Sequence, residues 1–426
     1  MDTIINAQLI SLIVFLTAYI LFIVLPNKRT LISVCGVALL LIFKAISPAQ
    51  ALKSVNWNVM GIFVGTLVVA DIFMESRMPA YLAELIVNRA KNTSWAILFI
   101  CALAGFISAF VENVATVLIV APIALSLTKK LKINPVNMMI GIAISSNLQG
   151  AATLIGDPPS MLLGGYAKMT FFDFFFYKGK PGIFFAVELG ALVSLFVLYF
   201  FFKGHTNKIE LPAEEKIKSW IPTVILSFMI IMLACSSFLD KGFGSLAGII
   251  CLIFGGISLL WGSFTKKEKI SENIKKLDWD TTFFLMGIFI LVGSLTLTGW
   301  IDKISSFISA SIGSNIFIGY TVIVFLSVFL SAFIDNVPFL VAMLPVAINV
   351  SRHLQVNPEL LMFGLLIGAS IGGNITPIGA SANIVACGLL KEEGYTVKFR
   401  DFAKIGLPFT LASVIAAYLF IWFVWK

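Results

Sequence analysis

The chain has 426 residues, of which 59% are hydrophobic and 12% are charged, and its mean hydropathy is +0.99. Soluble globular proteins carry about 25% charged residues, so the composition excludes a soluble domain and indicates a polytopic α-helical membrane protein. The net charge of +8 is better explained by basic cytoplasmic loops than by nucleic-acid binding.

The chain begins with three apolar segments at residues 9–25, 31–46 and 57–76. A membrane-spanning helix needs about 20 apolar residues, so we expect each segment to cross the bilayer. Residues 79–92 are amphipathic and too polar to cross, which predicts an interfacial helix.

Residues 94–127 are apolar except for a polar interruption at residues 111–116. They form either two full spans or a re-entrant hairpin with Glu112 and Asn113 at its tip. The buried polar tip favours the hairpin, because irregular backbone inside a membrane must face protein or water. Residues 137–165 have a polar centre rich in Gly and Pro, which predicts a discontinuous span on the same grounds.

A final span at residues 182–202 completes the first half, and a polar linker at residues 203–218 leads to a second half with the same order. Asp278-Trp279-Asp280 opens a span there, as Asn56-Trp57-Asn58 does in the first half. The other predicted elements are spans at 220–239 and 243–261, an interfacial helix at 300–310, a hairpin at 314–350, a discontinuous span at 359–390 and a last span at 402–425.

Residues 108–165 and 331–388 align without a gap at a constant offset of 223. The matched polar, Pro and Gly positions include Ser108 with Ser331, Asn113 with Asn336, Pro122 with Pro345, Thr153 with Thr376 and Gly156 with Gly379. Such matching predicts an internal duplication, with one repeat in residues 1–202 and the other in residues 219–426.

The basic residues predict the orientation of these repeats. With both hairpins re-entrant there are ten crossings, and most of the 30 lysines and arginines fall on one side, which the positive-inside rule makes cytoplasmic. Both termini then lie outside the cell membrane. Five crossings separate corresponding points, so the sequence predicts two inverted repeats, the layout of secondary transporters.

A carboxylate occupies the same position of each predicted hairpin tip, at Glu112 and Asp335. A charge at the bilayer centre costs roughly 2.5–3.5 kcal/mol. Either these groups couple transport to H⁺ or Na⁺, or they cap half-helices and only hold the tips together. Asp157, which has no counterpart in the second half, is a third coupling candidate or an N-cap beside Pro158.

The broken spans and tips supply the groups that could contact an ion or substrate. The candidates are Asn113, Thr116, Asn147, Thr153, Asn336, Asn374, Thr376, Ser381 and Asn383. Asn oxygens and free carbonyls suit Na⁺, which we expect near Asn113 and Asn336. The competing interpretation is helix packing through small residues. Neither the hairpin tips nor the broken spans contain Arg or Lys. This absence favours a cation or a small neutral or inorganic solute over a di- or tricarboxylate as the substrate.

Other functional classes find little support. The sequence contains no HExxH motif, paired catalytic Asp motif or Walker motif, so we expect neither an enzyme nor an ATP-driven pump. Apart from Na⁺ no cofactor is expected, and the expected partners are a small ion and membrane lipid.

Three motifs resemble those of a known family. Ser108 to Val114 with Ser331 to Val337, Ala152 to Pro159, and Pro377 to Asn383 are similar to the ion transporter superfamily. The nearest branch contains the arsenite permeases, the D-type sodium/proton antiporters and the melanosomal P protein. The resemblance implies a homodimer, with a scaffold and a mobile transport domain that carries both hairpins in an elevator-type movement.

Relatives in this superfamily move arsenite, Na⁺, citrate or dicarboxylates. The tips here read Glu112-Asn113-Val114 and Asp335-Asn336-Val337, without the Ser-Asn-Thr motif of the dicarboxylate branch. We therefore expect a secondary-active transporter for a small inorganic ion, by arsenite or antimonite efflux or by Na⁺/H⁺ exchange. The alternatives are a coupled citrate-like transporter and a passive anion channel on the same fold.

Overall fold

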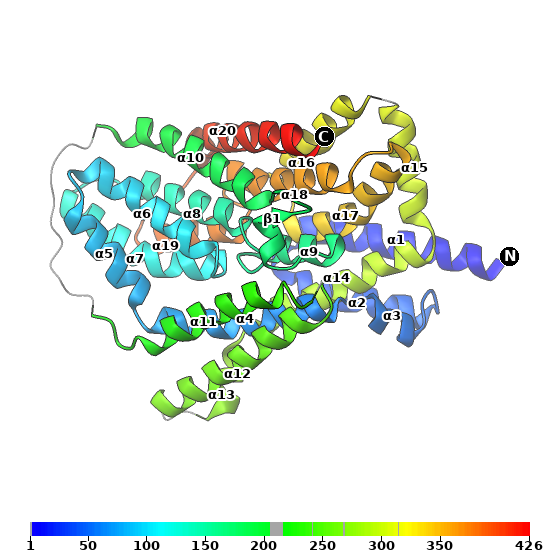
Figure 1. Ribbon diagram of the computed structural model, residues 1–426, viewed down its shortest axis with the longest axis horizontal. Coiled ribbons are helices and arrows are strands. Elements are labelled where there is room, and N and C mark those ends of the chain that lie inside the picture. Colours follow the sequence, from blue (N-terminus) through cyan, green and yellow to red (C-terminus); the bar gives the residue numbers. More distant parts are fainter. Residues whose placement is uncertain (1, 205–215, 241, 267–268, 314) are drawn as a thin grey trace.

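The computed structural model describes residues 2–204, 216–240, 242–266, 269–313 and 315–426 (Figure 1). These residues are helical almost throughout. The strands among them, β1 (Phe176–Tyr177) and β2 (Lys180–Pro181), form one short antiparallel hairpin. The predicted all-α class is therefore confirmed.

Each half contributes ten α-helices in the same order. The first half contains α1 (Asp2–Val24), η1 (Pro26–Lys28), α2 (Arg29–Ile42), α3 (Pro48–Ser54), α4 (Trp57–Glu75), α5 (Met78–Arg89), α6 (Thr93–Ser108), α7 (Asn113–Leu131), α8 (Val136–Gly150), α9 (Pro158–Ala167), η2 (Phe172–Phe174) and α10 (Ile183–Phe202). The second half contains α11 (Ile221–Ser236), α12 (Leu246–Lys266), α13 (Ile270–Lys276), α14 (Trp279–Leu297), α15 (Trp300–Ile312), α16 (Ile316–Ser331), α17 (Asn336–His353), α18 (Pro358–Gly372), η3 (Gly373–Ile375), α19 (Ser381–Glu392) and α20 (Phe399–Trp425).

Among the described residues, eight helices are long and apolar enough to cross a membrane. They are α1, α4, α7, α10, α12, α14, α18 and α20. The number of ten crossings stays a prediction, and α7 is long enough to cross by itself, so neither interpretation of the first hairpin is removed. The boundary at residues 203–218 also stays a prediction, because residues 205–215 lie outside the described part of the chain.

The predicted second span is too long. Residues 31–46 were expected to be one helix, but α2 ends at Ile42. Lys44 adopts the left-handed conformation, with φ at 53°, which breaks the helix. Ser47 then caps the short helix α3 by accepting a hydrogen bond from the Gln50 amide at 3.3 Å.

The helix breaks fall where the sequence predicts them. Residues 109–112 separate α6 from α7, and residues 332–335 separate α16 from α17. The spans at 137–165 and 359–390 are each interrupted, after Gly150 and after Gly372. The polar residues that open α4 and α14 act as caps. Asn56 accepts from the Val59 amide at 3.1 Å, and Asp278 from the Thr281 amide at 2.9 Å.

The helices fall into two groups by their packing. In the framework group, α1–α4 and α11–α14, α4 packs on α12 and α2 packs on α14. In the hairpin group, α5–α10 and α15–α20, α7 packs on α19 and α17 packs on α9. Each of these contacts joins one half of the chain to the other. The halves therefore interlock, while α4 and α14 carry most of the contact between the groups (Figure 1).

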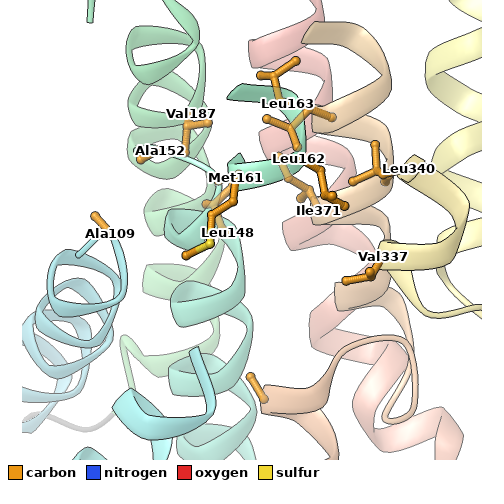
Figure 2. Packing of buried hydrophobic residues seen from close by; sticks show 14 of the residues in the cluster. Ala109, Leu148, Ala152, Met161, Leu162, Leu163, Val187, Val337, Leu340 and Ile371 are labelled. Atoms are coloured by element: carbon orange, nitrogen blue, oxygen red, sulfur yellow. The ribbon is translucent and has the colours of Figure 1, made fainter. Parts of the chain in front are cut away.

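The apolar core of the hairpin group continues across the two halves. Figure 2 shows Leu162 and Leu163 of α9 lying beside Leu340 of α17 and Ile371 of α18. All four side chains are fully buried, with an exposed fraction of 0%. In lipid such packing is favoured by dispersion contacts rather than by the hydrophobic effect, so close fit determines its strength.

Candidate functional site

Both hairpin tips are closed by the same pair of side chains. The Ser108 hydroxyl donates to Asn113 Oδ1 at 2.6 Å. At the duplicated position, the Ser331 hydroxyl donates to Asn336 Oδ1. These serines end α6 and α16, and the asparagines begin α7 and α17. The turn is thereby fixed, and each amide NH₂ group is free to point away from its own hairpin.

Buried amides connect the two tips through the broken spans. Asn113 Nδ2 donates to Asn147 Oδ1 at 3.2 Å. Asn147 Nδ2 in turn donates to Asn374 Oδ1 at 2.9 Å and to the Ser370 carbonyl oxygen at 2.8 Å. Asn336 Nδ2 approaches the same carbonyl at 3.5 Å. Four of the predicted site asparagines thus meet where α8 and α18 cross.

Backbone carbonyls converge beside each tip. A Cβ atom added at Gly156 would collide with the Gly150 oxygen and lie 2.9 Å from the Ser108 oxygen and 3.0 Å from the Ala109 oxygen. Any residue larger than Gly would fill this space. At the matching Gly379, the oxygens of Gly373 and Ala332 would lie at 2.5 and 3.0 Å.

Backbone carbonyl oxygens are suitable ligands for a sodium ion. Unwound backbone carbonyls in broken helices coordinate Na⁺ in secondary transporters. Thr153 and Thr376 donate to the carbonyl oxygens of Ala109 and Ala332, which holds those carbonyls toward the breaks. A Na⁺ ion at each tip, beside Asn113 and Asn336, stays a prediction.

The two tip carboxylates cap the helices that follow them. Glu112 Oε2 accepts from the Ala115 amide at 3.1 Å, and Asp335 Oδ1 accepts from the Val337 amide at 3.0 Å. Both carboxylates therefore act as helix N-caps, as one of the two interpretations expects. A cap uses one carboxylate oxygen, however, and both side chains also face the framework group.

The second tip carries an ion pair that the motifs do not contain. Arg29, at the start of α2, donates from Nη1 to Asp335 Oδ2 at 2.9 Å and from Nη2 to Thr281 Oγ1 at 3.0 Å. Its guanidinium also lies 5.1 Å from the centre of the Phe284 ring. The motifs themselves contain no basic side chain, and Arg29 reaches the tip from α2, a helix outside both motifs.

The first tip instead pairs two carboxylates. Asp157 caps α9 by accepting from the Ser160 amide at 2.8 Å. Glu112 is the other carboxylate, and the negative charges that act on it include Asp278 as well as Asp157. Both groups line a small pocket against Thr66 and Phe63 of α4. The predicted coupling residues of the first half therefore meet at the boundary between the hairpin and framework groups.

Three predicted site residues lie apart from this network. Thr116 is buried, but its hydroxyl donates to the Glu112 carbonyl within the helix at 3.2 Å. Asn383 ties the break together by donating to the carbonyl oxygens of Gly373 at 3.0 Å and Thr376 at 2.9 Å. Ser381 is exposed at the start of α19. Their roles in binding stay predictions.

Two charged residues were missed by sequence reasoning. Arg29 was counted only as a cytoplasmic basic residue, and nothing in its neighbourhood points to residue 335. Glu188 lies inside the apolar helix α10, and its carboxylate accepts from Gln149 Nε2 at 3.1 Å. A lone carboxylate in a span is a signal that sequence analysis could have used.

Comparison with known proteins identifies the class. A family model described as "Citrate transporter" matches residues 19–368, with a second match over residues 324–426. An uncharacterized transporter of Mycobacterium tuberculosis is 26% identical over 97% of this chain and 98% of its own length. The P protein of Mus musculus is 25% identical over 96% of this chain and 59% of that protein.

Solved structures share the fold. The YdaH transporter of Alcanivorax borkumensis superposes with a TM-score of 0.59 at 14% identity, covering 88% of this chain and 86% of that one. MtrF of Neisseria gonorrhoeae, which belongs to a class of antimetabolite efflux pumps, gives a TM-score of 0.56 at 15% identity, covering 88% of this chain and 83% of that one.

A polytopic membrane transporter is therefore the class that fold and relatives define. This chain belongs to the citrate transporter family of the ion transporter superfamily. The resemblance stated from the motifs is confirmed, as is the expectation that the protein is not an enzyme.

Proposed function

We propose that this protein is a secondary-active transporter of the cell membrane that couples a H⁺ or Na⁺ gradient to movement of a small inorganic ion. Arsenite or antimonite efflux and Na⁺/H⁺ exchange are the two favoured forms. The hairpin group is the moving body in an elevator-type cycle, and the framework group is the fixed scaffold of a homodimer.

The observation that carries this proposal is the position of the charged tips. Glu112 and Asp157 lie against α4, and Asp335 pairs with Arg29 at the start of α2, which also donates to Thr281 of α14. Both tips therefore meet the framework group through charge, while the amide network holds the hairpin group together internally. A charge that is neutralised on binding would release such a contact and permit sliding.

The two tips differ in a way that suggests a division of labour. Asp335 is neutralised by Arg29, whereas Glu112 lies beside a second carboxylate, Asp157. Like charges in a confined pocket attract a cation or share a proton. The first tip is therefore the proposed coupling site, and the ion pair at the second tip is the proposed latch between the groups.

One observation favours a second candidate, a coupled carrier of citrate-like carboxylates. Arg29 places a guanidinium at the second tip, and guanidinium groups bind carboxylates through paired hydrogen bonds. If Asp335 left Arg29 during the cycle, a substrate carboxylate could take its place. The description of the matching family agrees with this candidate.

Transport in proteoliposomes of the purified protein distinguishes these functions. Uptake and efflux of Na⁺, arsenite, citrate and chloride would be compared under imposed pH and Na⁺ gradients. The proposal expects transport of Na⁺ or arsenite against its gradient, driven by the coupling ion. Gradient-driven citrate accumulation would instead establish the second candidate. Current that follows voltage alone, without counter-ion stoichiometry, would indicate a channel and contradict both.

A further inference from the structure

A second cavity lies on the first hairpin's outer side, away from the carboxylate pair. It has a volume of about 400 Å³ and lies between α6, α8 and α10. Aromatic rings form much of its wall, from Phe106, Phe110, Phe175, Phe184 and Phe409. An empty apolar cavity forfeits dispersion contacts, so a space of this size favours an occupant with an apolar body.

The unpaired polar groups of the cavity can accept hydrogen bonds. Gln149 Nε2 donates to the Glu188 carboxylate, and Gln149 Oε1 has no partner within the described part of the chain. The Ser145 hydroxyl is also without a partner among the described residues. Gln149 is 9% exposed and Ser145 is 5% exposed, so lipid and bulk water leave them largely unsatisfied. A buried unpaired acceptor of this kind costs roughly 1–3 kcal/mol.

The duplication shows that the fold itself does not require these groups. The positions 223 residues later carry Gly368 and Gly372 in place of Ser145 and Gln149. There α16 packs directly on α18, since a Cβ at Gly368 or Gly372 would lie 2.6 Å from a backbone oxygen of α16. The first half therefore carries polar side chains, Ser145 and Gln149, where the second half has glycines at the helix contact.

We propose that this cavity binds an organic ammonium ion with an apolar body. The Glu188 carboxylate and Gln149 Oε1 accept hydrogen bonds from the ammonium head, and the phenylalanine rings hold the body. Aromatic faces also attract ammonium groups directly. No Lys or Arg lines the cavity among the described residues, so an anionic head would meet the Glu188 charge unopposed.

The probe for this site is decylammonium. Decyl sulfate, which has the same chain length and the opposite charge, is the control ligand. Binding to the purified protein in a non-ionic maltoside would be counted by native mass spectrometry. We expect one decylammonium per chain, bound at least tenfold more tightly than decyl sulfate. Glu188→Gln should weaken decylammonium binding roughly tenfold, because a charge-assisted hydrogen bond becomes a neutral one.

Two further variants keep the test decisive. Ala102→Trp fills the cavity while leaving the Glu188 carboxylate in the chain, and should abolish binding of decylammonium. Glu393→Gln removes a carboxylate paired with Lys129 elsewhere and should bind as the wild type does. Equal binding of the two probes, or unchanged binding by both Glu188→Gln and Ala102→Trp, would overturn the proposal.

The same variants identify the source of a natural ligand. Lipid extraction from the purified wild type would reveal an amine-bearing lipid that is depleted from Ala102→Trp. If the wild type binds decylammonium but carries no such lipid, the occupant is a soluble amphipathic amine. Either result supports the site and separates the two sources.

Discussion

At the scale of single residues, the site is built from amides and carboxylates in unequal surroundings. Asn147 contacts both halves of the chain at once, because its amide accepts from Asn113 and donates to Asn374 and to the Ser370 carbonyl. Asp335 has a basic partner, and Glu112 has an acidic neighbour. The duplicated positions have therefore acquired different chemistry on one backbone plan.

Replacing Asn147 by Ala should affect both stability and transport. The change leaves two buried groups, Asn113 Nδ2 and Asn374 Oδ1, without their partner, which costs roughly 1–3 kcal/mol for each unsatisfied group. We expect a lower unfolding temperature in detergent and loss of most transport. Asn349→Ala, which removes an exposed hydrogen bond to Asp302, is the matched control. An Asn147→Ala protein with wild-type transport would remove the amide network from the site.

Neutralising the two tip carboxylates should have different consequences. Glu112→Gln keeps an oxygen for the cap but removes the charge beside Asp157, so transport should lose its dependence on pH. Asp335→Asn also keeps an acceptor for the cap but frees Arg29, so we expect altered pH dependence and weakened contact between the helix groups. The measurement is the transport rate in proteoliposomes against pH. Wild-type pH profiles in both variants would exclude these carboxylates from coupling.

At the scale of elements, short segments attach the long helices to one another. The β1–β2 hairpin is one such segment, since Lys178 donates to Glu359 at the start of α18 at 2.6 Å. Lys180 donates to the Val424 carbonyl at the end of α20 at 2.9 Å, and Trp425 donates back to the Pro181 carbonyl at 3.2 Å. This hairpin thereby ties α18 and α20 together at one end of the hairpin group.

Removing Lys178 should destabilise the protein because Glu359 is only 3% exposed. Lys178→Met leaves that carboxylate unpaired, and we expect a loss of roughly 1 kcal/mol, since Lys178 itself is largely solvated. The double variant Lys178→Met with Glu359→Gln should recover part of this loss. Thermal unfolding of the three proteins measures it, and a double variant less stable than Lys178→Met would contradict the explanation.

The same pair predicts a pH dependence. The hydrogen bond to Glu359 raises the pKa of the Lys178 ammonium. A group whose pKa is raised on folding stabilises the folded state below its unfolded pKa, and that contribution disappears as pH rises through the folded value. The stability difference between wild type and Lys178→Met should therefore be constant near neutral pH and shrink only in strongly alkaline buffer.

At the scale of the whole molecule, two interlocked halves form two helix groups. Contacts between α7 and α19 and between α17 and α9 bind the halves within the hairpin group. The N-terminal end of α1 and the C-terminal end of α20 both face the right-hand side of Figure 1. An even number of crossings would place the termini in this way.

Labelling of the tips tests whether the hairpins are re-entrant. Phe110→Cys and Phe333→Cys, at positions 223 residues apart, would be introduced singly after replacement of the five native cysteines. Re-entrant tips near the midplane should react slowly with a membrane-impermeant maleimide from either side. Lys398→Cys and Lys178→Cys, predicted inside and outside, serve as fast-reacting controls. Tips that react as fast as these controls would place them in ordinary solvent-facing loops.

Local pattern was sufficient for much of this architecture. The membrane class, the duplication, the tips at Glu112 and Asp335 and the helix breaks all follow from the sequence, because composition, capping and Gly or Pro placement act over a few residues. The length of α2 was not predictable in the same way. Its apolar pattern continues past Ile42, and only the backbone turn at Lys44 ends it.

Tertiary structure alone decided which groups meet. Arg29 is 306 residues from Asp335, and Asn147 is 227 residues from Asn374. The periodicity of the sequence predicts neither contact, because the distance between the two side chains of each pair depends on how the helices pack. The Glu188 cavity has the same origin, because its walls come from α6, α8 and α10, which only helix packing brings together. The sequence by itself thus determined what kinds of groups enter the membrane, and helix packing determined their partners.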